Sequence, residues 1–92
     1  MVIFITGGAS GLGEQTAKDF HALGCKVAVL DINEDNLNRM KNELKISILC
    51  IKCDVTKEEE VKGAVEETVI TFGTIHVAIN CAGGGRFVPT LS

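Results

Sequence analysis

The chain has 92 residues, which is enough for one small domain, and 46% of them are hydrophobic, which excludes an intrinsically disordered protein. Its formal net charge of −3 argues against nucleic acid or an anionic membrane as a partner. No apolar run approaches membrane-spanning length and Met1 leads directly into a predicted strand, so we expect a soluble cytoplasmic protein without a signal peptide.

A glycine-rich stretch at residues 6–13 follows the first apolar run, residues 2–5. The run predicts a buried strand, and the residues after the glycines predict a helix. Backbone N–H groups at the start of a helix lack partners within the helix and carry the positive end of its dipole. The stretch is therefore suited to hold a phosphate group, with a purely structural glycine turn as the alternative.

This predicted helix ends at Gly24, a residue type common just after a helix. Its apolar residues recur at intervals of three and four, which is the spacing of one helical face. The residues expected on the buried face are Leu12, Thr16, Phe20 and Leu23.

A second apolar run, residues 27–30, ends in Asp31, which lies 18 residues after Gly13. In dinucleotide-binding folds, a carboxylate about 20 residues beyond the glycines meets the adenosine ribose. Asp31 is therefore a candidate ribose ligand. A second helix is predicted to open near Asn33, and its expected buried residues are Leu37, Met40 and Leu44.

A third strand is predicted within residues 46–53, where Cys50 and Cys53 form a C-x-x-C pattern. Side chains three apart on a strand point to opposite faces, so the pair is ill placed to share a metal or a disulfide. We expect all four cysteines of the chain to act as small hydrophobic residues.

The pattern Thr56-Lys57-Glu58-Glu59 is typical of a capping box, with Thr56 as the N-cap of a third helix that ends at Gly73. The acidic residues of this helix are expected to face solvent and to bind no metal. Its predicted buried stripe consists of Val61, Ala64, Val65, Thr68, Val69 and Phe72.

A fourth strand, residues 75–80, leads into Asn80-Cys81-Ala82-Gly83. Strands that alternate with helices predict an α/β fold with a doubly wound parallel sheet, here of about four strands in the order 3-2-1-4 with three helices. The strand order reverses between strands one and four, and ligands bind at such a switch point. We expect one partial domain over residues 1–83, a Gly-rich tail over 84–92, and an uncovered edge on strand four.

Three motifs resemble those of the short-chain dehydrogenase/reductase family. The pattern T-G-x-x-x-G-x-G occurs at residues 6–13, the D-V pair after strand three at Asp54-Val55, and N-C-A-G at residues 80–83. The resemblance implies an NAD(P)-binding Rossmann fold. The wording of the first and last motifs looks most like the 3-hydroxyacyl-CoA dehydrogenase type 2 branch, which would make the mitochondrial matrix the alternative location.

The resemblance also implies cofactor roles for individual residues. Backbone N–H groups around Ser10, Gly11 and Leu12 would bind the pyrophosphate. Asp31 would accept hydrogen bonds from the adenosine ribose, while Asp54 and the backbone of Val55 would bind the adenine. The full set of implied cofactor-binding residues is Gly7, Ser10, Gly11, Leu12, Gly13, Asp31, Asp54, Val55, Asn80, Ala82 and Gly83.

Asn80, Ala82 and Gly83 would line the ribose on the nicotinamide side, although Asn80 could instead tie down the glycine loop. NAD is expected rather than NADP, because Asp31 would repel a 2′-phosphate. No Arg or Lys lies within the glycine loop, and Ile32 follows Asp31.

The family's catalytic Tyr-x-x-x-Lys pair has no counterpart here, since the 92 residues contain no Tyr. We therefore expect no catalytic residue and no turnover by this chain alone. The predicted function is that of the NAD-binding N-terminal portion of a dehydrogenase acting on a secondary alcohol, hydroxyacyl or steroid-like substrate, with an alcohol or ketone bound only in a longer chain. Alternatives are a non-catalytic NAD-binding module and a regulatory fragment that pairs through the edge of strand four. Homo-oligomers are left open.

Overall fold

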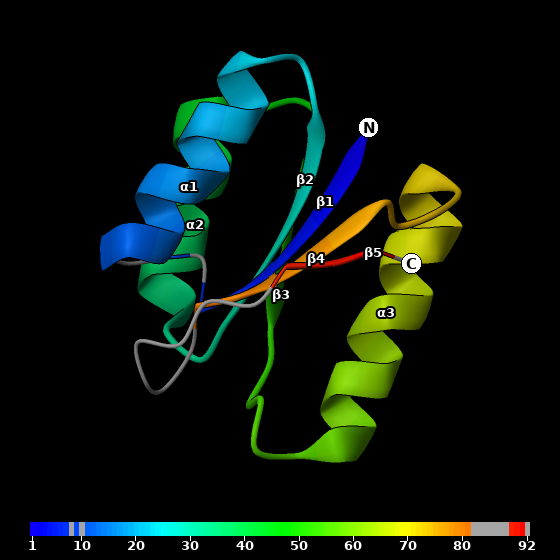
Figure 1. The fold of residues 1–92 in the computed structure, drawn as a ribbon. Coiled ribbons are helices and arrows are strands. Elements are labelled where there is room, and N and C mark those ends of the chain that lie inside the picture. The colour runs from blue at the N-terminus through cyan, green and yellow to red at the C-terminus, as the bar shows by residue number, and fades with distance from the viewer. Residues whose placement is uncertain (8, 10, 82–88, 92) are drawn as a thin grey trace.

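The computed structural model describes residues 1–7, 9, 11–81 and 89–91 (Figure 1). Its elements in chain order are β1 (Val2–Thr6), α1 (Gly11–Ala22), β2 (Lys26–Asp31), α2 (Glu34–Leu44), β3 (Ile48–Lys52), α3 (Glu58–Phe72), β4 (Val77–Asn80) and β5 (Pro89–Leu91). None of the described helices is long and apolar enough to cross a membrane.

The five strands form one sheet in the order β3-β2-β1-β4-β5. The first four are parallel, which confirms the predicted doubly wound sheet with strand order 3-2-1-4 and three helices. Helices α1 and α2 cover one face of the sheet and α3 covers the other, as Figure 1 shows.

The predicted uncovered edge of β4 is wrong. Strand β5 pairs antiparallel with β4, and Ile79 lies opposite Pro89. Residues 89–91 therefore satisfy backbone groups that would otherwise face outward, and a regulatory role through a free β4 edge has no support here. The predicted boundary between residues 83 and 84 lies outside the described residues and stays a prediction.

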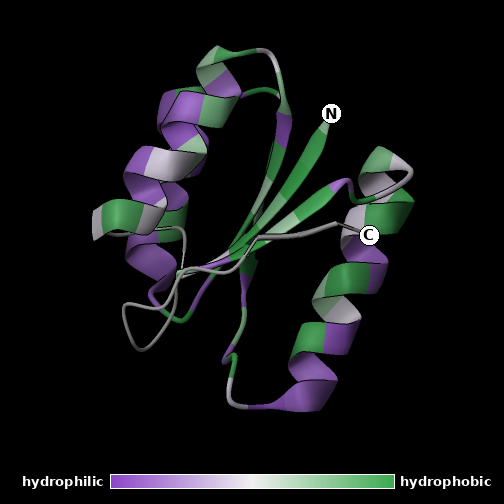
Figure 2. Cartoon of the chain, in the orientation of Figure 1, coloured by the Kyte–Doolittle hydropathy of each residue, from purple (hydrophilic) through white to green (hydrophobic). Residues whose placement is uncertain are grey.

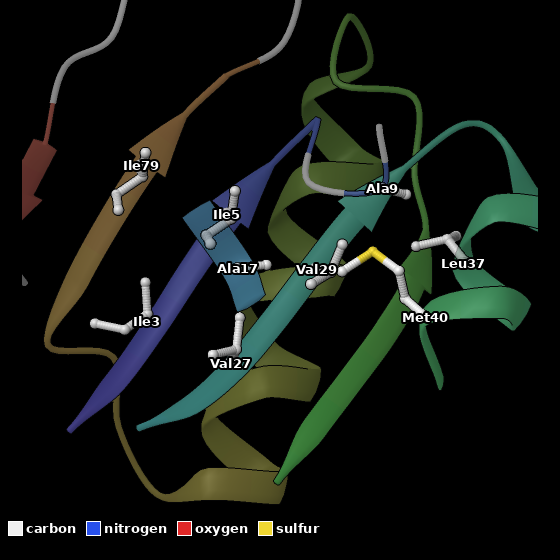
Figure 3. Close-up of a cluster of buried hydrophobic side chains, with 9 residues drawn as sticks. All are labelled: Ile3, Ile5, Ala9, Ala17, Val27, Val29, Leu37, Met40 and Ile79. Carbon is white, nitrogen blue, oxygen red and sulfur yellow. The ribbon is translucent and has the colours of Figure 1, made fainter. Parts of the chain in front are cut away.

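The core has two halves, one on each face of the sheet, because alternate residues of each buried strand point to opposite sides. Ile3, Ile5 and Val27 belong to the half beneath α1 and α2, which Figure 3 shows. Phe4 and Ala28 belong to the half beneath α3. In Figure 2 the central strands are accordingly hydrophobic, while the start of α3 is strongly hydrophilic.

The buried face of α1 differs from the predicted one. Gly13 and Ala17 face the sheet, whereas Leu12 and Leu23 are 71% and 77% exposed. Small residues at the contact allow the helix to lie close to the strands, so Leu12 and Leu23 fall outside it, whereas Phe20 packs against this half of the core as predicted. The prediction followed hydrophobicity and missed this close approach.

Helix α2 begins as predicted. The side chain of its N-cap residue Asn33 accepts a hydrogen bond from the backbone N–H of Asn36 at 3.0 Å. Leu37 and Met40 are buried, and Leu44 packs against the same half of the core.

Helix α3 begins one residue later than predicted, with Lys57 as an N-cap that makes no side-chain capping bond. The hydroxyl of Thr56 donates instead to Asp54 Oδ1 at 2.6 Å, so the predicted capping box is absent. The buried stripe is also narrower than predicted. Ala64 and Thr68 are buried, but Val65 and Val69 are at least one-third exposed, because only one line of side chains faces the sheet.

Strand β3 is shorter than the predicted 46–53. Lys45 and Ser47 have φ of 64° and 57°, and such left-handed backbone cannot continue a strand. Cys50 packs against one half of the core and Cys53 lies in the other, which confirms that they occupy opposite faces. All four cysteines are free, and burial raises the pKa of the Cys50 and Cys53 thiols, as expected of inert hydrophobic cysteines.

Two glycines, one inside α3 and one at its C-cap, should respond oppositely to alanine. Gly63 lies inside the helix, where an added Cβ meets nothing within 4 Å, so Gly63→Ala should raise the free energy of unfolding by about 0.5–1 kcal/mol. An added Cβ at Gly73 also meets nothing within 4 Å, but Gly73 has a φ of 92°, a backbone conformation that is strained for alanine. Gly73→Ala should therefore lower the free energy of unfolding by about 1 kcal/mol or more. Urea denaturation of the two variants measures both effects. Shifts in the same direction would contradict this account.

Candidate functional site

The carboxyl ends of β1, β2 and β4 meet at one edge of the sheet. Thr6 at the end of β1 lies opposite Leu30 of β2 on one side and Asn80 of β4 on the other. The glycine loop therefore begins between Asp31 and Asn80, which confirms the predicted convergence at the switch point. Gly8, Ser10, Ala82 and Gly83 lie outside the described residues.

The glycine loop is fixed to both neighbouring strands through its backbone. Gly7 N–H donates to Leu30 O at 2.7 Å, and Cys81 N–H donates to Thr6 O at 2.9 Å. Gly7 and Gly11 have φ of 69° and 54°, which favour glycine over any residue with a Cβ. The chain thus leaves β1 at Gly7 and enters α1 at Gly11 with backbone conformations that a residue with a side chain would adopt only with strain.

Asp31 joins the glycine loop to the start of α2. Its Oδ2 accepts a hydrogen bond from Ala9 N–H at 3.1 Å, and its Oδ1 accepts one from Asn33 N–H at 3.0 Å. A carboxylate has about four acceptor positions, so both oxygens can still accept from a ligand hydroxyl. The bond from Asn33 N–H to Asp31 closes an Asx turn, in which an Asp side chain accepts from the backbone N–H two residues later. The sequence signals this turn, because Asp is a residue type that commonly forms it. Nothing local signalled the bond to Ala9.

Asn80 supports the end of β1 beneath the loop. Thr6 Oγ1 donates a hydrogen bond to Asn80 Oδ1 at 2.9 Å, across the two adjacent parallel strands. The sequence suggested two roles for Asn80, tying down the glycine loop and contacting the cofactor directly. This hydrogen bond to Thr6 is a contact of the first kind.

A cleft of about 200 Å³ opens between the sheet and the start of α3. Its lining residues are Phe4, Thr6, Val55, Val61, Ala78, Ile79 and Asn80. Apolar walls with two polar groups at one end suit a flat ring that carries polar atoms on its edge. Val55 therefore lines a hollow of the right chemistry for such a ring.

Asp54 lies beside this cleft at the end of the β3 segment. Its carboxylate accepts hydrogen bonds from the hydroxyl and the backbone N–H of Thr56, which lower the pKa of Asp54 below its usual value. Its own N–H donates to the carboxylate of Glu60 at 3.0 Å. The Asp54 carboxylate is thus charged and held in place at neutral pH.

The two histidines lie at the opposite edge of the sheet from the glycine loop. His21 Nε2 contacts Ile46 O at 2.7 Å, and His76 Nδ1 accepts from Val2 N–H at 2.8 Å. Both make structural contacts at the amino ends of strands, far from the switch point.

A cluster of four charged side chains joins α1 to α2. Arg39 donates two hydrogen bonds to the Glu14 carboxylate at 2.8 and 2.9 Å, and Lys18 bridges Glu14 and Glu43 at 2.9 and 3.1 Å. Only the Glu14–Lys18 spacing of four residues could be read from the sequence. The hydrogen bonds from Arg39 and then Lys18 lower the pKa of Glu14 to about 2 from the ordinary 4.5.

The Glu14 pKa gives the stability a defined pH dependence. Since the pKa is lower in the folded chain, the cluster stabilises it above pH 4.5 and loses that contribution as the pH falls toward 2. Glu14→Gln should therefore lower the free energy of unfolding by about 1 kcal/mol at pH 7, after allowance for solvent screening, and change it little near pH 2. Urea denaturation at several pH values tests this, and a difference that does not vary with pH would contradict it.

Comparison with known proteins identifies relatives over the whole chain. The family model for short chain dehydrogenases matches residues 1–92. Tropinone reductase-like 2 of Erythroxylum coca is 43% identical over 82 residues, which are 89% of this chain and 30% of that protein. The 3-hydroxyacyl-CoA dehydrogenase type-2 of Drosophila melanogaster is 34% identical over 91 residues, 99% of this chain and 36% of that protein.

Among solved structures, the 3-ketoacyl-(acyl-carrier-protein) reductase from Brucella melitensis, complexed with NADH, superposes with a TM-score of 0.81 and 35% sequence identity. The match covers 84% of this chain and 32% of the reductase. The chain thus spans about a third of the length of the relatives it matches. The type 2 branch is represented among them, but the choice of branch stays a prediction.

Proposed function

Because this chain belongs to the short-chain dehydrogenase family, we propose that it forms the NAD-binding portion of an oxidoreductase that acts on a secondary alcohol or the corresponding ketone. The observation that carries the proposal is the position of the Asp31 carboxylate. It lies against the backbone of the glycine loop, where a dinucleotide places its adenosine ribose next to its pyrophosphate.

In this proposal each part of the cofactor has a place among the described residues. The pyrophosphate would lie against backbone N–H groups at the start of α1, near Gly11 and Leu12. The ribose hydroxyls would donate to Asp31, and the adenine would enter the cleft beside Val55. Bound NAD would supply the hydride acceptor, while these residues bind and orient it.

The preference for NAD over NADP follows from charge. The Asp31 carboxylate would stand where NADP carries its 2′-phosphate, and Ile32, 63% exposed, offers no positive charge to that group. A 2′-phosphate would therefore meet the negative charge of Asp31, and Ile32 would offer it no positive charge in return.

Isothermal titration calorimetry of the chain with NAD and with NADP tests the proposal. We expect NAD to bind at least about tenfold more tightly than NADP. In the Ile32→Arg variant the ratio of NAD affinity to NADP affinity should fall, because the guanidinium can pair with the 2′-phosphate of NADP. Ile70→Arg, which adds the same positive charge at a site 83% exposed on α3, is a matched control that should leave the ratio unchanged. Equal affinity for both cofactors would contradict the charge argument, and binding of neither would contradict the proposal.

We also propose that the 92-residue chain does not turn over alone. The family's Tyr, which would act as the general acid or base, is absent from these 92 residues. Alcohol-dependent formation of NADH in proportion to the concentration of purified chain would contradict this.

A further inference from the structure

The charged cluster of Glu14, Lys18, Arg39 and Glu43 reaches the proposed pyrophosphate position through Glu14. Glu14 is in the first turn of α1, about 4.5 Å along the helix axis from Gly11 at a rise of 1.5 Å per residue. A carboxylate in a first turn interacts favourably with the positive end of the helix dipole. A diphosphate at the glycine loop would use the same positive end, so Glu14 and the ligand compete for it.

The positive partners of Glu14 offset its charge, which leaves the positive end of the helix dipole available to the ligand. Arg39 occupies both Glu14 oxygens in a forked pair, and Lys18 adds a second cation at 2.9 Å. Glu43 balances the second cation, so the two acids and two bases have no net charge. The Glu14 side chain is 16% exposed with both cations in place, so if Arg39 is lost, Lys18 and partial screening by solvent are left to offset its charge.

We propose that Arg39 is a positioning residue for dinucleotide binding, acting through Glu14: by neutralising this carboxylate it keeps the start of α1 able to accept a diphosphate. The inference rests on the proposed function. It assigns to a residue of α2, outside all three sequence motifs, a part in the affinity for the cofactor.

Binding of ADP, measured by calorimetry at about 20 mM salt where screening is weak, tests the inference. Arg39→Gln should weaken ADP binding about threefold, because Glu14 then faces the diphosphate with one cation fewer. Glu14→Gln should leave ADP binding unchanged or tighter. The double variant should return to within about twofold of the unaltered chain. Arg39→Lys loses the forked geometry but keeps the positive charge, so it should retain most of the affinity.

A purely structural clamp between α1 and α2 predicts a different pattern. Arg39→Gln and Glu14→Gln break the same ion pair and should lower stability similarly, so a clamp would weaken ADP binding in both. Equal weakening, or no effect of Arg39→Gln, would overturn the inference. Failure of the unaltered chain to bind ADP would overturn the proposed function as well.

Two controls separate the charge effect from others. Adenosine lacks phosphate, so its affinity should be the same in the unaltered chain and in all four variants. Lys41→Gln removes a positive charge from the last turn of the same helix and should leave ADP binding within about 1.5-fold, because it lies farther from the loop. Raising the salt to about 0.2 M should shrink the Arg39→Gln effect, and an effect that persists undiminished would count against the inference.

Discussion

Asp31→Ala is expected to weaken NAD binding by about 100-fold or more. The carboxylate would accept hydrogen bonds from the adenosine ribose, each worth about 1.5–3 kcal/mol when the acceptor is charged. It also holds the backbone N–H groups of Ala9 and Asn33, so its loss would loosen both the glycine loop and the start of α2. Calorimetric titration with NAD measures the effect.

Two variants make this expectation specific. Asp31→Asn retains an acceptor oxygen and should lose only part of the affinity. Asp35→Ala removes the same charge from an exposed position in the first turn of α2 and should change NAD affinity by less than about threefold. Equal losses for Asp31→Ala and Asp35→Ala would mean that overall charge, not the placement of Asp31, governs binding.

Ile3→Ala is expected to lower the free energy of unfolding by about 3–4 kcal/mol. Ile3 is completely buried on the central strand β1 and packs within the half of the core beneath α1 and α2 (Figure 3). Its truncation removes hydrophobic contact and leaves a cavity among rigid neighbours. For a domain of this size such a loss is a large fraction of the total stability.

The matched control is Ile70→Ala, which makes the same chemical change at a site that is 83% exposed on α3. It should change the free energy of unfolding by less than about 0.5 kcal/mol. Urea denaturation of both variants measures the difference. Similar losses in the two would show that β1 is not the buried centre of the sheet.

Elements whose sequence pattern reports on local geometry were predicted well. The apolar runs before the glycine loop and before Asp31 predicted β1 and β2, and Asn33 was recognised as the start of α2. These signals are local, because a buried parallel strand, a glycine turn and an N-cap each depend on neighbouring residues.

What the sequence did not predict depends on contacts between distant residues. The buried face of α1 follows from close helix–sheet packing at Gly13 and Ala17, where hydrophobicity misleads. The pairing of Pro89 with Ile79, and the bonds from Arg39 to Glu14, join residues with no shared motif. The link between Asp31 and Ala9 is of the same kind, and it gives the candidate site its shape.

The central claim, that a dinucleotide binds at the carboxyl ends of β1, β2 and β4, is tested most directly by an NMR titration of the ¹⁵N-labelled chain with NAD. The account predicts that the largest amide shift changes fall at Gly7, Ala9, Gly11, Leu12 and Asp31, with smaller changes at Val55. Amides at the opposite edge, such as Ser47 and Gly73, should be unchanged. Shift changes concentrated at that opposite edge, or none at millimolar NAD, would contradict it.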